Sequence, residues 1–435
     1  MTPYRAALPL IVAAFYGGLF LLRAVGFDGL YESLLYGLGI VPFKFPFVDE
    51  HAILSAAQCH RQGMSIFPTN PCDVLLRPLP YSPLWLDLIP AFMTTDDTPA
   101  LGVAFVLTFL AGLFLVARPT SWRDLILLAI AGTSTCVTFA VERGNADLLL
   151  FGLAAVAIVL YGRGPTARLG AYAVGFAGGV LKFYPFVLLA LALRETPARL
   201  LLIALTAGVG LLTFAGYYHS GILDALGVVP SGAYFGDGFN AQDLPFGIAE
   251  LGGYAGALAW AILVGLMAAC LTIVAALARR FQAATAPLDW STHETRSLLA
   301  GSLLIVGCVF AGQSVGYRGI FLLLVLPGLM LLRRSIGERG LEALLRLTIA
   351  AVLLLLWEEG IRHSFEFDLR TIGVEDTVPG LPSTMFWVLR ELVWWWVVSV
   401  LATTVVLFAA QSPVGQQIAR ACFPASAGPV PRPRV

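Results

Sequence analysis

Two adjacent carboxylic acids, Asp49 and Glu50, follow the first long apolar run of the sequence, and His51 stands beside them. An acid in the first turn of a helix, or at its N-cap, complements the helix dipole, and this is one interpretation of Asp49. A carboxylate at a membrane surface also accepts a proton from a hydroxyl group, and burial raises its pKa toward the working range. The pair is therefore a candidate for general-base chemistry.

Lysine is rare in this chain, because Lys44 and Lys182 are its two lysines beside 25 arginines. Lys182 lies inside an apolar run and is followed directly by Phe183, Tyr184 and Pro185. An ionisable residue in such a run is costly and is a candidate for function. The alternative is a lysine that extends its amine to the lipid headgroups. A cation at this position suits an anionic ligand such as a phosphate.

Two short segments place polar residues at turns between apolar runs. The segment "VERGNADLLL" carries Arg143, Asn145 and Asp147, and "GQSVGYRG" carries Tyr317 and Arg318. Arg143 and Asp147 have the spacing of an ion pair on one helix, so a structural pair and a substrate contact are both open. Arg318 in a tight turn is suited to bidentate binding of a phosphate.

Two outer segments carry weaker candidates. The Pro-rich "TNPCDVLLRPLPYSPLWL" contains Asp73 and Tyr81, which form either a pocket rim or ordered packing, and Asp73 is also placed to cap a turn. The segment "WEEGIRHSFEFDLR" contains Glu358, Glu359 and His363, which we interpret mainly as a solvated face, with a substrate contact by His363 as the alternative. Three tryptophans, 394–396, fit an interfacial belt.

Of the six cysteines, Cys59 and Cys72 fall in the first long loop between apolar runs. An oxidising compartment permits a disulfide between them, which would fix the chain after the acidic pair. The alternative is metal binding by Cys59, His60 and Cys72, but a fourth ligand at zinc-like spacing is lacking.

The whole chain must hold these residues in a bilayer. It has 435 residues, 58% hydrophobic and 12% charged, with a mean hydropathy of +0.82, whereas a soluble domain is about 25% charged. Recurrent long apolar runs predict an all-α polytopic membrane protein with about twelve spans. We place these spans at 7–26, 99–117, 124–140, 146–161, 169–181, 184–193, 199–217, 253–278, 297–312, 319–332, 342–357 and 385–411.

Charge predicts the orientation of these spans. The side with both termini carries 17 of the 27 Lys and Arg residues and 6 of the 27 acids, so the positive-inside rule makes it cytoplasmic. The loops 27–98, 218–252 and 358–384 then lie outside, and the stretch 81–93 within the first is expected as an interfacial helix. We favour two short helices over one long helix for 169–193, meeting near "LKFYP". Residues 1–411 form one membrane domain, and 412–435 form a cytoplasmic Pro-rich tail.

Three of these segments together resemble integral-membrane glycosyltransferases of the C-type fold, and most closely glycosyltransferase family 87, which contains polyprenol-phosphate-mannose-dependent α-1,2-mannosyltransferases. The segment "VDEHAILSAAQCHRQG" is similar to the family's D-x-x-x-Y-x-x-A-x-x-x-x-x-G pattern. The segment "RGNADLLLFGLAAVA" resembles its RGN-x-D followed by an apolar helix. The segment "AYAVGFAGGVLKFYPFVLLALAL" resembles its AG-x-x-x-G-x-A-x-x-x-K-x-x-P. Glu50 and His51 depart from the pattern, which leaves the sugar and the acceptor open.

The resemblance implies an inverting transfer of a mannose-like hexose from a polyprenyl-phosphate donor to a glycan or glycolipid hydroxyl. Asp49 would be the base, and Lys182, Arg318 and Arg143 would bind the donor phosphate. No cofactor or metal is expected. The other polar residues are assigned to the substrate pocket: Glu50, His51, Asn145, Asp147, Tyr184, Tyr317, Asp73, Tyr81 and His363.

The expected location is the bacterial inner (cytoplasmic) membrane, with both termini cytoplasmic and the site facing the periplasm. The expected partners are the lipid bilayer and the two substrates, without nucleic acid. A transporter or flippase is the first alternative, although polar residues then belong near the bilayer midplane in an inverted repeat. A surface-polysaccharide ligase is the second, although its outer loops would be led by arginines and a histidine.

Overall fold

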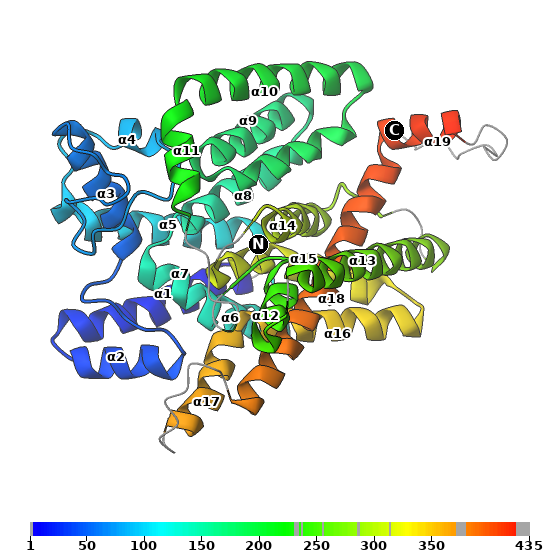
Figure 1. Cartoon of the computed structure of the whole chain (residues 1–435). Helices are drawn as coiled ribbons and strands as arrows, with labels where there is room; N and C mark the ends of the chain where they lie inside the picture. Colours follow the sequence, from blue (N-terminus) through cyan, green and yellow to red (C-terminus); the bar gives the residue numbers. More distant parts are fainter. Residues whose placement is uncertain are drawn as a thin grey trace.

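The computed structural model describes residues 3–229, 235, 238–254, 256–284, 288–312, 315–370 and 380–422, and for residues 3, 365–370 and 422 it describes the backbone only. Within these residues the protein is helical and forms no β-strand; one antiparallel bridge joins Gly238 to Val315. Figure 1 shows the helices and their order along the chain. The all-α prediction is therefore confirmed for the described part of the chain.

The helices that the predicted spans name have the following bounds. In chain order they are α1 (Pro3–Ala24), α5 (Thr98–Val116), α6 (Trp122–Gly132), α7 (Thr135–Arg143), α8 (Asp147–Tyr161), α9 (Pro165–Lys182), the 3-10 helix η2 (Tyr184–Arg194), α10 (Pro197–Tyr217), α13 (Gly256–Ala284), α14 (His293–Phe310), α15 (Leu322–Ser335), α16 (Arg339–Leu356) and α18 (Leu381–Gln411).

The remaining elements lie in the connecting segments. They are α2 (Asp28–Gly37), α3 (Val48–Arg61), α4 (Leu84–Leu88), η1 (Thr95–Asp97), α11 (His219–Gly227), α12 (Asp243–Gly252), η3 (Gly316–Phe321), α17 (Glu358–Arg370) and α19 (Pro413–Cys422). The expected interfacial helix over 81–93 is reduced to the five residues of α4. In the predicted tail α19 is helical, and 423–435 lie outside the described residues.

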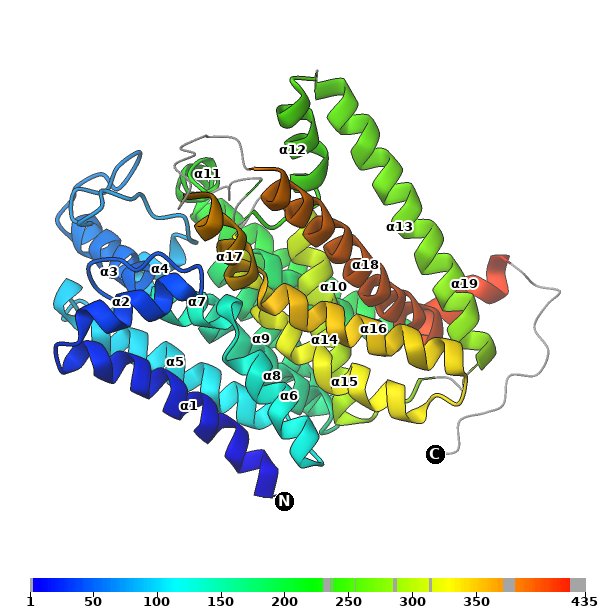
Figure 2. The ribbon, with the colours of Figure 1, turned by 90° about the horizontal axis from the view of Figure 1, so that it is seen from below.

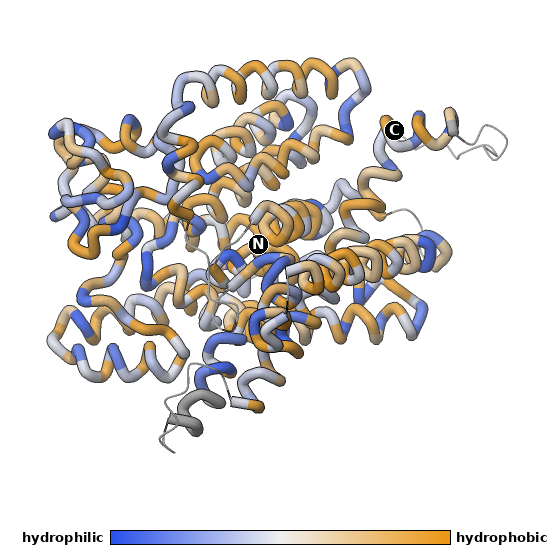
Figure 3. Tube along the Cα trace, in the orientation of Figure 1, coloured by the Kyte–Doolittle hydropathy of each residue, from blue (hydrophilic) through white to orange (hydrophobic). Residues whose placement is uncertain are grey.

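The twelve predicted apolar runs all fall in helical segments, with 124–140 divided between α6 and α7, but fewer helices are long and apolar enough to cross a bilayer. Among the described residues there are six such helices, or eight if two bent pairs each form one span. The bent pairs are α6 with α7, at 50°, and α16 with the first residues of α17, at 65°. The protein is thus a multi-pass membrane protein, and Figure 3 shows the hydrophobic residues concentrated along helices such as α10 and α13.

The connecting elements gather at one side of the helix assembly. Figure 2 shows α3, α11, α12 and α17 on one side and the N-terminal end of α1 on the opposite side. Helices α8, α14 and α15 are buried over most of their residues and lie between these two sides. The long first loop, with α3 and α4, therefore lies at the same end of the molecule as the later outer segments.

The run 169–193 is broken where the sequence predicted. α9 ends at Lys182, Phe183 has a φ of 59°, and η2 begins at Tyr184. Pro185 explains why α9 does not continue, because it has no N–H to donate to the carbonyl group four residues before it. The second piece is a 3-10 helix rather than an α-helix. The backbone thus turns sharply next to the buried lysine.

A second break separates α7 from α8 and corrects one prediction. Gly144 has a φ of +60° and ends α7, so Arg143 and Asp147 lie on different helices and are not an intrahelical pair. Arg143 instead lies 3.4 Å from Glu142 (Nε to Oε2), and Asp147 pairs with Lys182. The predicted ion pair between Arg143 and Asp147 is wrong, because the four-residue spacing brings two side chains together only on one continuous helix.

Candidate functional site

The start of α3, the end of α9 and the segment at η3 face one another across a cavity of about 180 Å³. Its wall comes from the first loop, from the end of α9, from the segment after α11 and from η3. The residues that line it are Asp49, Ala52, Arg77, Pro78, Pro80, Tyr81, Lys182, Val228, Val229, Val315, Tyr317 and Arg318. Segments far apart in the sequence thus bring one carboxylate and three cations to one space.

Asp49 is held from three sides yet stays open to the cavity. It lies in the first turn of α3, as one interpretation of the sequence required, while the N-cap position belongs to Phe47. Its Oδ2 accepts hydrogen bonds from Asn145 Nδ2 at 2.7 Å and from the Tyr81 hydroxyl at 3.4 Å. Its Oδ1 lies 3.4 Å from Arg77 Nη1, and the side chain is 18% exposed. A fixed and accessible carboxylate of this kind is suited to accept a proton.

Lys182 does not extend to the headgroups, because its side chain is only 8% exposed and two of the three N–H groups of its amine bond within the protein. Nζ lies 2.7 Å from Asp147 Oδ1 and donates to Asn145 Oδ1 at 2.8 Å. The Tyr184 hydroxyl donates to the same Asp147 oxygen at 2.7 Å. The buried cation is therefore compensated by one carboxylate, as a buried charge must be.

Three cations line the cavity, and carboxylates pair with Arg77 and Lys182. Among the described residues, no carboxylate forms an ion pair with the third cation, Arg318. Its guanidinium lies over the ring of Tyr184, with Cζ 4.9 Å from the ring centroid. Its buried Nε has no hydrogen-bond partner in the described part of the chain. Because a buried donor without a partner is unfavourable, this N–H is available to an anionic group in the cavity.

Asn145 connects the two sides of the cavity. Its amide nitrogen donates to Asp49 and, at 3.2 Å, to the Tyr81 hydroxyl, while its amide oxygen accepts from Lys182. The side chain is completely buried and its oxygen also accepts from the Asp147 backbone N–H at 3.0 Å. The orientation of this amide is thereby fixed, and with it the separation of the carboxylate from the cation.

A second group of polar contacts holds Arg77, which is outside the predicted set of site residues. Asp73 receives hydrogen bonds from Arg77 Nη2 at 3.0 Å and from the Leu75 N–H at 2.7 Å, and its Oδ2 lies 3.4 Å from His51 Nδ1. Burial alone would raise the pKa of Asp73, but the hydrogen bonds from His51 and Arg77 outweigh it and lower that pKa. Asp73 and His51 therefore lie behind Arg77 and position it.

The predicted disulfide between Cys59 and Cys72 is present, with a Cα–Cα distance of 5.8 Å. It joins the last turn of α3 to the residue before Asp73, so it ties the helix of Asp49 to the loop of Arg77. The alternative, a metal bound by these cysteines, is wrong because both are oxidised. Within the described ranges, no group of three or more His, Cys, Asp or Glu side chains is placed to hold a metal ion.

Eight of the thirteen predicted site residues do not line the cavity. Five of these contact lining residues directly or through one partner: His51, Asp73, Asn145, Asp147 and Tyr184. The other three are Arg143, His363 and Glu50. Arg143 stacks on Phe43, with Cζ 3.9 Å from the ring centroid, and His363 of α17 lies beside Gly39. Glu50 is completely buried, and neither carboxylate oxygen has a hydrogen-bond partner among the described residues. Burial, together with the neighbouring Asp49, raises the pKa of Glu50 well above its usual value.

Glu50 also explains the glycine at position 144. A Cβ at Gly144 would lie 1.7 Å from Glu50 Oε2, so the carboxyl group occupies the space that a side chain would need. The positive φ of Gly144 makes any other residue unfavourable there as well. Glu50 therefore packs against the turn that presents Asn145.

The last outer segment corrects the prediction of a solvated face. Glu358 and Glu359 are buried, and Glu358 accepts a hydrogen bond of 3.0 Å from Trp394 Nε1. Trp394 and Trp395 are buried too, so they do not form an interfacial belt. These residues pack inward because α17 folds back along α18, and the acids then meet buried donors.

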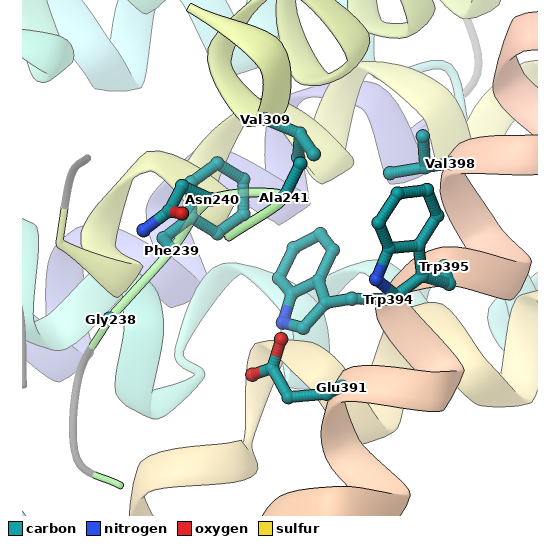
Figure 4. Close-up of a pocket in the computed structure, with 9 residues that line it drawn as sticks. All are labelled: Gly238, Phe239, Asn240, Ala241, Val309, Glu391, Trp394, Trp395 and Val398. Carbon is teal, nitrogen blue, oxygen red and sulfur yellow. The ribbon is translucent and has the colours of Figure 1, made fainter. Parts of the chain in front are cut away.

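The same region contains polar residues that the sequence did not single out. Figure 4 shows Asn240 and Glu391 with the rings of Phe239, Trp394 and Trp395. These residues line a space of about 10 Å³, which is room for about one water molecule. Arg390 pairs with Glu391 at 2.7 Å (Nη2 to Oε1). The space is too small to admit a sugar. The network of polar contacts around it joins α18 to its neighbours.

In comparisons with known proteins, no family model, no curated protein and no solved structure matches the chain.

Proposed function

We propose that the protein is an inverting glycosyltransferase of the C-type fold, which transfers a mannose-like hexose from a polyprenyl-phosphate donor to a hydroxyl group of a glycan or glycolipid. One observation carries this proposal: Asp49 and the cations Lys182 and Arg318 line the same cavity of about 180 Å³. A carboxylate opposite a pair of cations is what such a transfer needs, with the sugar between them.

The carboxylate side supplies the base. The oxygen of the acceptor hydroxyl forms a bond to the anomeric carbon, and Asp49 takes the proton that this hydroxyl loses. The bond from that carbon to the phosphate oxygen breaks, and its electron pair leaves with the polyprenyl phosphate. One displacement inverts the anomeric configuration, so a second carboxylate acting as nucleophile is unnecessary.

The cation side stabilises the leaving group. A sugar phosphodiester carries one negative charge and becomes a phosphomonoester, so negative charge grows on its oxygens during the reaction. Arg318 and Lys182 face that growing charge in a largely buried environment, where such interactions are strong. Since Asp147 already offsets Lys182, Arg318 is the cation that balances the charge of the bound donor.

The arrangement of the site fits a substrate with a lipid tail. The chain has several membrane-spanning helices, and the cavity lies at the end of the molecule where its connecting elements gather. With the arginine-rich side cytoplasmic, the cavity faces the periplasm of a bacterial inner membrane. The donor phosphate then lies at the outer leaflet, and the glycan acceptor approaches from the aqueous side.

The test is transfer of radiolabelled sugar by the purified protein from polyprenyl-phosphate mannose, glucose and arabinose to membrane glycolipid and glycan fractions. We expect label from one donor to move, and Asp49→Asn to reduce transfer about 10²- to 10⁴-fold, the usual contribution of a general base. Binding of the donor should be retained, because Asp49 faces the acceptor.

The matched control is Glu50→Gln, which makes the same acid-to-amide change one residue along the helix. Equal loss in both variants would remove the role of Asp49 as the specific base. Failure of the wild-type protein to turn over or bind any donor in a wider panel would overturn the enzyme and favour a transporter of the lipid-linked sugar.

A further inference from the structure

An apolar groove of about 460 Å³ lies between α9, η2 and α10, apart from the polar cavity. Its lining is aliphatic and aromatic except for the hydroxyl groups of Tyr172 and Thr206. The lining residues are Leu169, Tyr172, Ala173, Phe176, Leu189, Leu202, Ile203, Thr206, Ala207 and Gly210. A groove of this composition offers little to a sugar or a peptide and much to a hydrocarbon chain.

The groove opens toward the bilayer rather than toward water. α10 is long and apolar enough to cross a bilayer, and only 6% of its 18-residue apolar stretch is buried inside the protein. Leu202 lines the groove and is still 65% exposed, so the groove is continuous with the lipid-facing surface. Figure 1 shows α10 standing along the edge of the molecule beside α9. The molecules that reach this groove are therefore lipids.

One end of the groove is positively charged. Tyr172, in the groove wall, donates a 2.9 Å hydrogen bond to Glu195 Oε1, and Arg168 Nε lies 2.5 Å from the same oxygen. Arg199, in the first turn of α10, lies 3.4 Å from Glu195 Oε2 and is 54% exposed. Two arginines meet one glutamate there, so the end of the groove carries a net positive charge.

The other end of the groove is narrow. Phe176 lies against Gly210, where an added Cβ would be 2.9 Å from its ring, and the ring stacks edge-on against Phe186. Lys182 lies six residues further along α9 and is not among the residues that line the groove. A lipid headgroup is thus better accommodated at the arginine end than at the polar cavity.

We propose that this groove binds one hydrocarbon chain of an anionic phospholipid, and that Arg199 contacts the phosphate of the headgroup. The lipid comes from the leaflet at the N-terminal end of α10, which the positive-inside rule makes cytoplasmic. This site is separate from the proposed sugar transfer and does not depend on it. The bound chain fills the space between α9 and α10 and joins a loosely held span to the rest of the protein.

The experiment is native mass spectrometry of the full-length protein after incubation with equimolar phosphatidylglycerol and phosphatidylcholine of identical chains. We expect the wild-type protein to retain one phosphatidylglycerol with about fivefold preference, the effect of one basic residue at an anionic surface. Arg199→Gln should abolish the preference, whereas Arg123→Gln, on α6, should keep it. Unchanged preference in Arg199→Gln would overturn the headgroup contact.

The groove itself is tested by a matched pair on α10. Ala207→Trp fills the groove, and Ala204→Trp adds the same ring to an exposed position outside it. We expect the first to lose the retained lipid and the second to keep it; equal retention would overturn the proposal. Polyprenyl phosphate is included as a competing probe. If Ala207→Trp removes that probe and leaves phosphatidylglycerol bound, the groove holds the tail of the sugar donor instead.

Discussion

Asn145 donates a hydrogen bond of 2.7 Å from its Nδ2 to Oδ2 of Asp49. The other end of the same buried amide accepts from Lys182 at 2.8 Å, so one side chain sets the distance between the carboxylate and the cation. Two groups that act on opposite sides of one reacting bond must be held at a fixed separation. The asparagine is therefore a positioning residue for both.

Asn145→Asp should impair transfer and shift its dependence on pH. The variant removes the donor to Asp49 and places a second carboxylate beside it, which favours protonation of the pair. We expect transfer to fall about 100-fold, the cost of misplacing a catalytic group, and the acidic limb of the pH–rate profile to move to higher pH. The profile of transfer between pH 5 and 9 measures both effects.

The control for this variant is Asn240→Asp, the same change at a buried amide that is bonded to Asp243, away from the cavity. It should lower stability without moving the acidic limb. If the two variants show the same pH–rate profile, Asn145 has only a structural role.

Lys182→Met should separate the charge of the lysine from its packing. Removing one partner of a buried ion pair leaves Asp147 uncompensated and costs about 3–5 kcal/mol of stability. The double variant Lys182→Met/Asp147→Asn should recover much of that loss, because the buried charge is gone from both partners. Both variants should bind the donor weakly.

Thermal unfolding and donor binding, measured on the same preparations, check the two effects. Full donor affinity in the double variant would contradict the role of Lys182 as a phosphate ligand.

Local patterns in the sequence predicted much of this arrangement. The apolar runs located the helices, the arginines at both ends of 169–193 indicated a break near "LKFYP", and the two outer cysteines indicated the disulfide. These features depend on neighbouring residues in the chain, so the sequence contains them directly. The same holds for the first-turn position of Asp49.

Contacts between distant segments could not be predicted in the same way. Asn145 and Asp49, which form a hydrogen bond, are 96 residues apart in the sequence. Neither segment contains a pattern that predicts contact with the other. Arg77 enters the cavity because Asp73 and the disulfide fold the loop back onto α3. The burial of Glu358 and Glu359 likewise depends on α17 lying along α18, whereas their local sequence is typical of an exposed face.

Glu50→Gln should stabilise the protein increasingly as the pH rises. Burial, and then the nearby Asp49, raises the pKa of Glu50 in the folded state above the usual 4.5. The folded state therefore holds the proton of Glu50 more tightly than the unfolded state. The stability that comes from the protonated Glu50 is lost as the pH rises above about 4.5. Glutamine keeps the shape of the protonated acid without this loss. Unfolding midpoints of the variant and the wild-type protein between pH 5 and 9 should diverge in favour of the variant.

The exposed acid Glu32 on α2 provides the comparison. Glu32→Gln should leave the midpoint within the error of the wild-type protein across the same range. A wild-type protein that is more stable than Glu50→Gln at pH 8 would mean that the ionised Glu50 has a stabilising partner in the folded protein.

Loss of the disulfide should weaken both the fold and the site. The bond closes a loop between α3 and the segment that carries Asp73 and Arg77, so the pair Cys59→Ala/Cys72→Ala should lose about 2–4 kcal/mol of stability. Arg77 lies 3.4 Å from Asp49, so loosening its loop should also lower transfer while donor binding through Lys182 and Arg318 persists. The measurement is the unfolding midpoint and the transfer rate with and without a reducing agent. Reduction should bring the wild-type protein to the level of the alanine pair and leave that pair unchanged; a reductant that slows both proteins equally would show that the bond does not act on the site.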